Sequence, residues 1–141
     1  MIFDYERSAI IARKQPCPPK FCWYNALKAL RHRSLDLPAS TKYVEGWVKT
    51  NHGIAIEHGW LELEDGTILD PTFVAAGWEI ALELGTERGT YQQHEYFPGI
   101  RYSREELKGV RLNKLPHVHD THGFFGCDSP EYQQAMFDAQ Q

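Results

Sequence analysis

Apolar side chains repeat at helical spacing directly after a proline-rich segment. The run Cys17-Pro18-Pro19-Lys20 holds the chain extended, because proline has no amide hydrogen and restricts the residue before it. From residue 21 to about residue 32, the apolar positions form a stripe with i, i+3, i+4 spacing, made of Trp23, Ala26, Leu27 and Leu30. This pattern predicts a helix that starts just after the prolines, with Cys22 in its first turn.

Two strands and a tight turn are expected in the middle of the chain. Residues 43–48 are rich in β-branched and aromatic side chains, which is typical of a strand. Residues 53–63 alternate, so that one face carries Ile54, Ile56, His58 and Trp60. The turn Glu64-Asp65-Gly66 leads into residues 67–72 and predicts a β-hairpin.

The second half of the chain carries weaker signals. Residues 77–84 fit a helix or a strand, and residues 85–98 have the composition of a loop. Ser103 and Glu106 have capping-box spacing and predict a short helix, while Ser129-Pro130 predicts a last helix that ends near residue 139. With no repeat or linker in between, the pattern predicts a single α+β domain over residues 1–141.

Composition narrows the possible partners and compartment. Hydrophobic residues make up 42% and charged residues 24%, as in ordinary globular domains. A net charge of −4 and a pI near 5.9 argue against a nucleic-acid partner. No apolar run reaches the roughly 18 residues that cross a bilayer, and the charged start does not resemble a secretory signal. We therefore expect a cytoplasmic protein without a membrane partner.

Cys22 is the first candidate for chemistry. Its predicted place at a helix N-terminus favours the nucleophilic thiolate, because unpaired N–H groups and the positive end of the helix dipole lie there. A small buried hydrophobe is the alternative. The three cysteines, which include Cys17 and Cys127, are an odd number without the spacing of a disulfide scaffold, so reduced thiols are expected.

His58 is the candidate base. A histidine takes up a thiol proton near neutral pH, and the apolar strand face of His58, with Trp60 two residues on, would exclude water from the ring. A histidine that is simply hydrogen-bonded within the core has the same pattern. The geometry of the predicted hairpin decides which acidic group can reach this ring.

Asp70 is the candidate that orients the histidine. A two-residue turn would place Asp70 opposite Leu61, on the wrong face of the hairpin. A three-residue turn with Gly66 in the left-handed region pairs Trp60 with Asp70 instead, one diagonal step from His58. From there an aspartate can fix the tautomer of the ring and stabilise its cation. An aspartate before proline is also common in turns and caps.

These residues resemble a known group of enzymes. Cys22 at a helix start, His58-Gly59-Trp60 and Asp70-Pro71-Thr72 are similar, in the same chain order, to the Cys, His-Ala-Trp and Asp-Pro-Thr signatures of papain-like and transglutaminase-like thiol enzymes. The resemblance covers residues 15–72, and small bacterial and phage proteins look similar around residues 43–46. The chain departs from the pattern at Gly59, where alanine is usual, and by the short connection between the histidine and the aspartate.

The resemblance implies a fold and a reaction. The fold is a papain-like or transglutaminase-like core, in which the nucleophile's helix packs on an antiparallel sheet that carries the histidine and the aspartate. The activity is that of a cysteine protease, amidase or transglutaminase-like enzyme, with a thioester at Cys22 that water or an amine resolves. The substrate is then a peptide, a protein or a small amide, and no cofactor is expected. Hydrolysis, acyl transfer and deamidation remain open, as does the oligomeric state.

Other side chains are candidates for supporting roles. An oxyanion would be stabilised by the Cys22 backbone N–H and a side-chain donor, and Gln15 precedes the cysteine much as in papain-like enzymes. Asn25, one turn along the helix, serves the site or braces the helix against a neighbouring strand, and we expect bracing. The candidates that line a substrate cleft are Trp23, Glu45, Trp47 and Trp60, although Glu45 and Trp47 equally fit a half-buried strand.

Two alternatives compete with a thiol enzyme. His117, His119, His122 and Cys127 are possible zinc ligands, which would define a small zinc-binding protein. No predicted helix or strand fixes their geometry, so we expect no bound metal. The other alternative is a noncatalytic binding module on the same fold, which would have little need to keep Cys22, His58 and Asp70 together.

Overall fold

The chain combines helices with one antiparallel sheet. The computed structural model describes residues 2–18, 21–50, 53–75, 94–110, 126 and 128–141. The elements of these residues are, in chain order, α1 (Tyr5–Lys14), α2 (Cys22–Arg31), the 3-10 helix η1 (Arg33–Leu35), β1 (Lys42–Lys49), β2 (Ala55–Glu62), β3 (Ile68–Leu69), α3 (Pro71–Ala75), β4 (Glu95–Tyr102) and α5 (Pro130–Ala139). The predicted α+β class is confirmed at this level.

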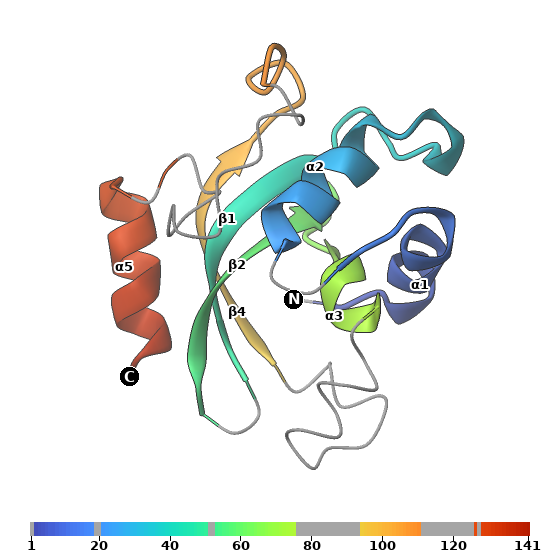
Figure 1. Cartoon of the computed structure of the whole chain (residues 1–141). Coiled ribbons are helices and arrows are strands. Elements are labelled where there is room, and N and C mark those ends of the chain that lie inside the picture. The colour runs from blue at the N-terminus through green and yellow to red at the C-terminus, as the bar shows by residue number, and fades with distance from the viewer. Residues whose placement is uncertain (1, 19–20, 51–52, 76–93, 111–125, 127) are drawn as a thin grey trace.

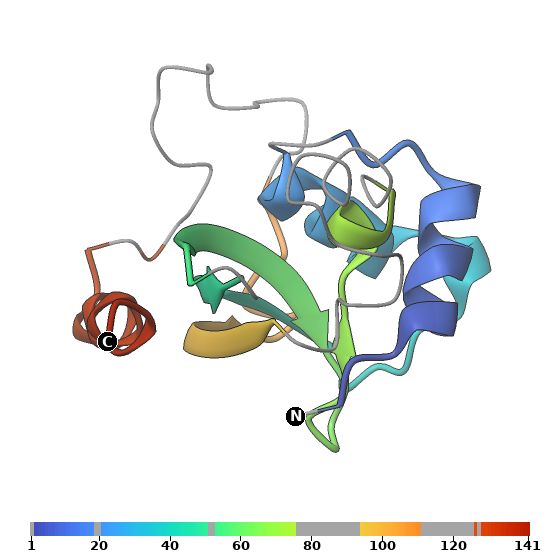
Figure 2. The same ribbon diagram turned by 90° about the horizontal axis from the view of Figure 1, so that it is seen from below.

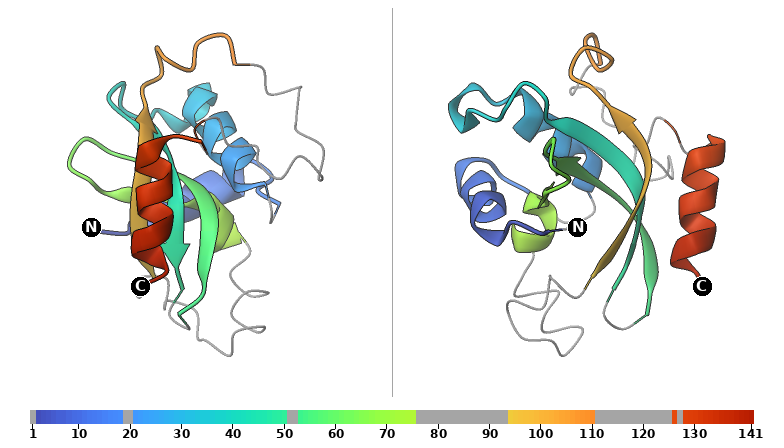
Figure 3. Two further views of the ribbon diagram at one scale, coloured as in Figure 1. Left: turned by 90° about the vertical axis from the view of Figure 1, so that its left-hand side faces the viewer. Right: turned by 180° about the vertical axis from the view of Figure 1, so that it is seen from behind.

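The sheet is curled, and helices lie on both sides of it (Figures 1 and 2). Its strand order is β3-β2-β1-β4, with antiparallel neighbours. Helix α5 packs against β4 and β1, whereas α1, α2 and α3 gather near β2 and β3 (Figure 3). None of the helices within the described ranges is long and apolar enough to cross a membrane.

Two apolar clusters form the core. One lies under α2 and combines Ile11, Ala26, Leu27, Ala29, Leu30, Tyr43, Leu61, Leu69 and Leu107. The other joins the N-terminal segment and α3 to the sheet, and consists of Phe3, Val44, Val48, Trp60, Ile68, Phe73 and Tyr96. Because β2 and β3 contribute to both clusters, the hairpin that they form is fixed from both faces.

The hairpin has the register that a three-residue turn requires. Leu61 lies opposite Leu69, and the N–H of Leu63 donates to the carbonyl of Thr67 at 2.8 Å. Gly66 has a φ of 89°, in the left-handed region that glycine adopts without strain. The prediction for this turn is confirmed, and β3 therefore delivers Asp70 to the face of β2 that carries the histidine.

Two of the predicted helices are confirmed and one is wrong. Helix α2 begins at Cys22, and α5 begins at Pro130 with the Ser129 hydroxyl as its N-cap. At residue 103 the capping box forms, because Ser103 and Glu106 exchange backbone-to-side-chain hydrogen bonds of 3.0 and 3.2 Å. Residues 104–109 nevertheless make only turns. A cap contributes about 1 kcal/mol, which does not offset helix nucleation without a packed apolar face.

Helix α1 precedes the proline-rich segment, whereas the first helix that the sequence predicts starts after it, so this part of the prediction is wrong. Asp4 caps it by accepting the N–H of Arg7 at 2.9 Å, and its buried residues are Ser8, Ala9 and Ile11. Only one of these three is a large apolar side chain, so the sequence lacks the broad stripe that signals a surface helix. The helix is held by tertiary contacts with α3.

Strand β4 corrects the prediction of a loop over residues 85–98. Pro98 and Gly99 lie in the middle of this strand, and both residue types weaken a strand signal. Gly46 pairs with Pro98, whereas the preceding Glu45 pairs with Ile100, so the strand has a bulge at Gly99. A proline is tolerated there because β4 is the last strand of the described sheet. Residues 77–84 and the rest of that loop lie outside the described residues.

The bulge gives a stability prediction. A Cβ on Gly46 would lie 2.3 Å from the carbonyl oxygen of Phe97, so Gly46→Ala must displace β4 and is expected to cost about 2–3 kcal/mol. Gly66→Ala is the matched control, since no atom lies within 4 Å of its Cβ and only the left-handed backbone costs about 1 kcal/mol. Urea unfolding of both variants measures the difference. Equal losses would contradict the close approach of β1 and β4.

Candidate active site

The start of α2 places Cys22. Helix α2 begins at this residue, and Phe21 at the N-cap provides no side-chain hydrogen bond to the first turn. The first N–H groups therefore lack a side-chain cap, which leaves the positive end of the helix dipole beside the thiol. Cys22 is 7% exposed. The position at a helix N-terminus confirms the sequence prediction, whereas the burial is a feature that the alternative of a small buried hydrophobe shares.

Polar side chains tie this helix start to its surroundings. The Asn25 amide donates to the carbonyl of Pro18 at 3.0 Å and to the hydroxyl of Thr72 at 2.9 Å. Asn25 therefore braces α2, as expected, although its partner lies on α3 and not on a strand. Thr72 belongs to the Asp-Pro-Thr segment, so one short stretch of chain carries both the aspartate of the candidate site and the anchor of the helix that begins at Cys22.

His58 and Asp70 form a buried pair. The Nε2 atom of His58 lies 2.7 Å from an Oδ2 atom of Asp70, and both side chains are buried. The second carboxylate oxygen accepts the N–H of Phe73 at 3.3 Å, and the Asp70 N–H donates to the Ser8 hydroxyl at 2.9 Å. The Tyr96 hydroxyl donates to the same Oδ2 atom at 2.7 Å. Asp70 is thus held from four sides.

The thiol joins this pair through the imidazole. Burial lowers the pKa of His58, but the charges of Asp70 and Cys22, with hydrogen bonds to both, raise it overall from 6.5 to about 10. Asp70 takes up Nε2, which leaves Nδ1 of the ring as the nitrogen that a thiol could use.

Aromatic rings hold the plane of the imidazole. Phe73 stacks on His58 with centroids 4.2 Å apart and an interplanar angle of 11°, and Trp60 lies 6.1 Å away at 20°. Stacking on a phenyl face favours the cationic imidazolium. Trp60 is fully buried, so it fits the predicted role of excluding water.

Gly59 has a packing reason that explains the departure from the Ala of the His-Ala-Trp signature. A Cβ at this position would lie 3.2 Å from the Cα of Trp23 and 3.2 Å from the ring of Tyr43. Both contacts are tighter than ordinary van der Waals contact. The glycine therefore allows the first turn of α2 to approach β2 beside His58.

The predicted oxyanion donor has other partners. The Gln15 amide nitrogen donates to the carbonyl of Asn25 at 2.9 Å and lies 3.6 Å from the sulfur of Cys17. These two contacts use both protons of the amide. A role in oxyanion binding stays a prediction and requires one proton to leave its present partner.

The predicted cleft residues differ in burial. Glu45 is fully buried and accepts hydrogen bonds from the Tyr43 hydroxyl at 2.7 Å and the Gly126 N–H at 2.8 Å, which gives its carboxylate a structural use. Trp60 is fully buried as well, in the wall behind the histidine. Trp23 and Trp47 are half-buried. Trp23 follows Cys22 directly, so it is the cleft candidate nearest to the thiol in the chain.

Three residues of the site are absent from the sequence prediction: Ser8, Phe73 and Tyr96. Phe73 directly follows the Asp-Pro-Thr segment, so its aromatic side chain next to the motif is a usable signal. Ser8 and Tyr96 are far from Asp70 in the chain and lie on α1 and β4, neither of which the sequence predicts.

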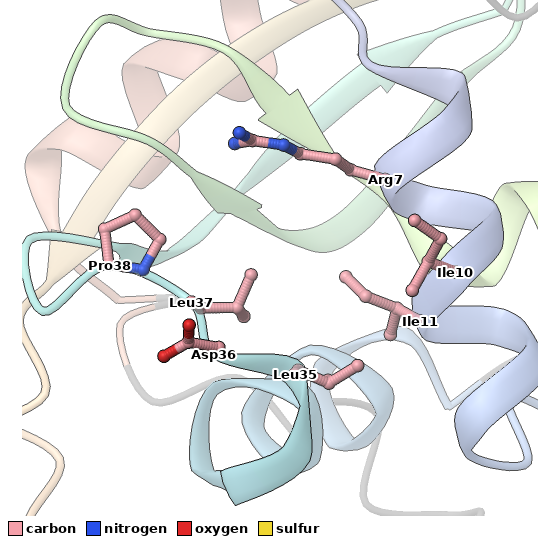
Figure 4. Close-up of a pocket in the computed structure, with 7 residues that line it drawn as sticks. All are labelled: Arg7, Ile10, Ile11, Leu35, Asp36, Leu37 and Pro38. Atoms are coloured by element: carbon pink, nitrogen blue, oxygen red, sulfur yellow. The ribbon is translucent and has the colours of Figure 1, made fainter.

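Two further candidate regions are the predicted zinc ligands and a hollow beside α1. The predicted zinc ligands His117, His119, His122 and Cys127 lie outside the described residues, and among the described ones no three His, Cys, Asp or Glu side chains are grouped to hold a metal ion. A hollow of about 320 Å³ lies between α1 and the segment of residues 35–38. Figure 4 shows Ile11, Leu35 and Leu37 pointing into it, and no triad residue lines it.

The His58 pair predicts how stability depends on pH. The folded-state pKa of about 10 lies above the ordinary 6.5, so the stability that the imidazolium contributes is complete below about pH 6.5 and is lost as the pH rises through about 10. The difference in unfolding free energy between wild type and His58→Gln should therefore be largest near pH 6, on the order of several kcal/mol, and shrink towards pH 10. Urea unfolding across this range measures it. A difference independent of pH would mean that folded His58 is neutral.

Comparisons with known proteins complete the description of the site. No protein-family model matches the chain, and the searches of curated proteins and of solved structures find no match either. The case for a function therefore depends on the geometry of Cys22, His58 and Asp70.

Proposed function

We propose that this protein is a thiol enzyme of the papain-like or transglutaminase-like kind, which transfers an acyl group from an amide, peptide or isopeptide bond to Cys22. The observation that carries the proposal is the buried His58–Asp70 hydrogen bond, together with the Cys22 thiol, which helps to raise the pKa of the same imidazole. A nucleophile, a base and an orienting carboxylate in this order are the parts that covalent acyl transfer needs.

Electrostatics supports an ion pair at this site. The raised pKa of His58 means that the ring holds its proton at neutral pH when Asp70 and the Cys22 thiolate are charged beside it. The attraction is mutual, so the imidazolium and the positive end of α2 favour the thiolate. Cys22 is then a nucleophile that needs no further activation.

The chemical steps follow from this ion pair. The Cys22 thiolate attacks the carbonyl carbon, and the Cys22 backbone N–H stabilises the oxyanion that forms. The C–N bond then breaks, and the proton of the His58 imidazolium passes to the leaving amine, which leaves a thioester and a neutral imidazole. Water or a second amine attacks the thioester while His58 takes a proton from it, and Cys22 departs as thiolate.

Cys17 is a built-in comparison for Cys22. Both thiols are buried to the same extent, 7% exposed, but burial raises the pKa of Cys17 above its ordinary value. Its hydrogen-bond partner is the Gln15 amide, which is not a base. A difference in reactivity between the two thiols therefore reports on His58 and the helix start, and not on access alone.

Selective alkylation tests the proposed ion pair. We expect iodoacetamide to modify Cys22 at about pH 6, where an ordinary thiol is almost wholly protonated, and Cys17 only at alkaline pH. His58→Ala should lower the rate at Cys22 by about tenfold or more at this pH, because the thiolate loses its counter-ion. Mass spectrometry of the digested protein assigns each modified cysteine, and Asp70→Ala should give a smaller loss.

The controls separate the proposal from its alternative. His32→Ala removes a histidine beyond the end of α2 and should leave alkylation of Cys22 unchanged. Alkylation of Cys17 and Cys22 at equal rates, with a common alkaline midpoint and no response to His58→Ala, would refute the triad. The noncatalytic binding module would then be the better description.

A thioester can be trapped directly. Mixing the protein with p-nitrophenyl acetate should release a burst of nitrophenolate close to one equivalent, because an activated ester acylates a nucleophilic thiol faster than water resolves the thioester. The acetyl group should be found on Cys22 by mass spectrometry. Cys22→Ala should abolish the burst while Cys17→Ala retains it, and a burst that survives Cys22→Ala would place the nucleophile elsewhere.

A further inference from the structure

One oxygen of Asp70 has two donors. The Nε2 atom of His58 and the hydroxyl of Tyr96 both lie 2.7 Å from Oδ2. The two donors come from different strands, β2 and β4, and lie far apart in the chain. The sequence motif accounts for the histidine alone, and the tyrosine is a part of the site that the motif does not contain.

Packing of the Tyr96 ring aims its hydroxyl. The ring meets the edge of Trp60 with centroids 5.0 Å apart at 74°, and it stacks on Phe3 at 6.3 Å and 29°. Tyr96 is 7% exposed. Burial and the neighbouring Asp70 raise the pKa of Tyr96 well above 10, so the phenol keeps its proton and remains a donor throughout the neutral range.

The polar groups around Asp70 come from five parts of the fold. His58 faces it from β2 and Tyr96 from β4, the backbone N–H of Phe73 donates from α3, and the Ser8 hydroxyl from α1 accepts the Asp70 N–H. Two thiols lie farther out. Cys22 on α2 affects the pKa of His58, and the charge of Asp70 raises the pKa of Cys17, which precedes α2. Among these side chains, His58 and Tyr96 are the two that donate to the carboxylate.

We propose that Tyr96 is a positioning residue of the triad, whose hydroxyl keeps Asp70 ionised and directs Oδ2 at Nε2 of His58. The inference rests on the proposed function. A hydrogen bond to a carboxylate favours its charged form. Without this donor, Asp70 takes up a proton at a higher pH as the solution is acidified, and His58 loses the charge that stabilises its cation. The thiolate of Cys22 is then lost at a higher pH too.

The pH profile of alkylation at Cys22 tests this role. Tyr96→Phe keeps the ring and its packing but removes the donor. It should move the acid limb of the profile, where the rate falls towards low pH, up by about one pH unit, because the carboxylate loses a hydrogen bond that favours its charged form. Tyr132→Phe is the matched control, because it removes a tyrosine hydroxyl that donates to a different carboxylate, Glu57. Its acid limb should coincide with that of the wild type.

A double-mutant cycle distinguishes positioning from general stability. Because Tyr96 acts through the charge of Asp70, Tyr96→Phe should shift the acid limb in the wild type but not in an Asp70→Asn background. A purely structural effect would lower stability equally in both backgrounds and leave the limb in place. Thermal melts of all variants set the assay temperature below unfolding.

A measurement on the wild type does not depend on the folding of any variant. The ring-carbon NMR shift of Tyr96, followed with labelled tyrosine, should move with the same midpoint as the acid limb, because loss of the Asp70 charge changes the partner of the hydroxyl. Suppose that His58→Ala slows alkylation of Cys22, but the NMR midpoint differs from that of the acid limb and Tyr96→Phe leaves the limb in place. The inference about Tyr96 is then wrong and the proposed function stands. If His58→Ala leaves alkylation of Cys22 unchanged, the proposed function itself fails.

Discussion

The arrangement of the whole site depends on one buried carboxylate. Asp70 is fully buried, and an unpaired charge at such a position would cost several kcal/mol. Donors from three separate elements meet its two oxygens: His58 on β2, Tyr96 on β4 and the backbone of Phe73 in α3. The sheet and α3 must therefore assemble together for Asp70 to be charged. The fold in turn holds the imidazole in a fixed plane, and its Nδ1 atom is not used by Asp70.

Helix α2, which carries Cys22, is attached to the same short segment of chain. Thr72, two residues after the aspartate, accepts a hydrogen bond from Asn25 on α2. Gly59, next to the histidine, allows the first turn of α2 to pack closely on β2. The start of α2 is thus positioned by residues that lie beside Asp70 and His58 in the chain. A displacement of either element would move the thiol of Cys22 relative to the ring of His58.

Sequence reasoning was sufficient where the interactions are local. The place of Cys22 follows from the prolines before α2, and the register that brings Asp70 to His58 follows from Gly66 and the alternation of side chains along a strand. It failed where the signal was weak or the contact distant. Pro98 weakened the strand signal of β4. The capping box at residue 103 predicted a helix that does not form, because capping is a local property whereas helix stability comes from packing.

By itself the sequence determined the helix that begins at Cys22, the hairpin and the shared face of His58 and Asp70, because turn chemistry and the two-residue period of a strand act over only a few positions. Only the tertiary structure decided that Tyr96 donates to Asp70, that Phe73 stacks on the imidazole and that the carboxylate of Glu45 accepts the N–H of Gly126. These contacts join segments whose separation in the chain leaves no periodic trace. Their geometry depends on how the curled sheet brings donors to the buried carboxylate of Asp70.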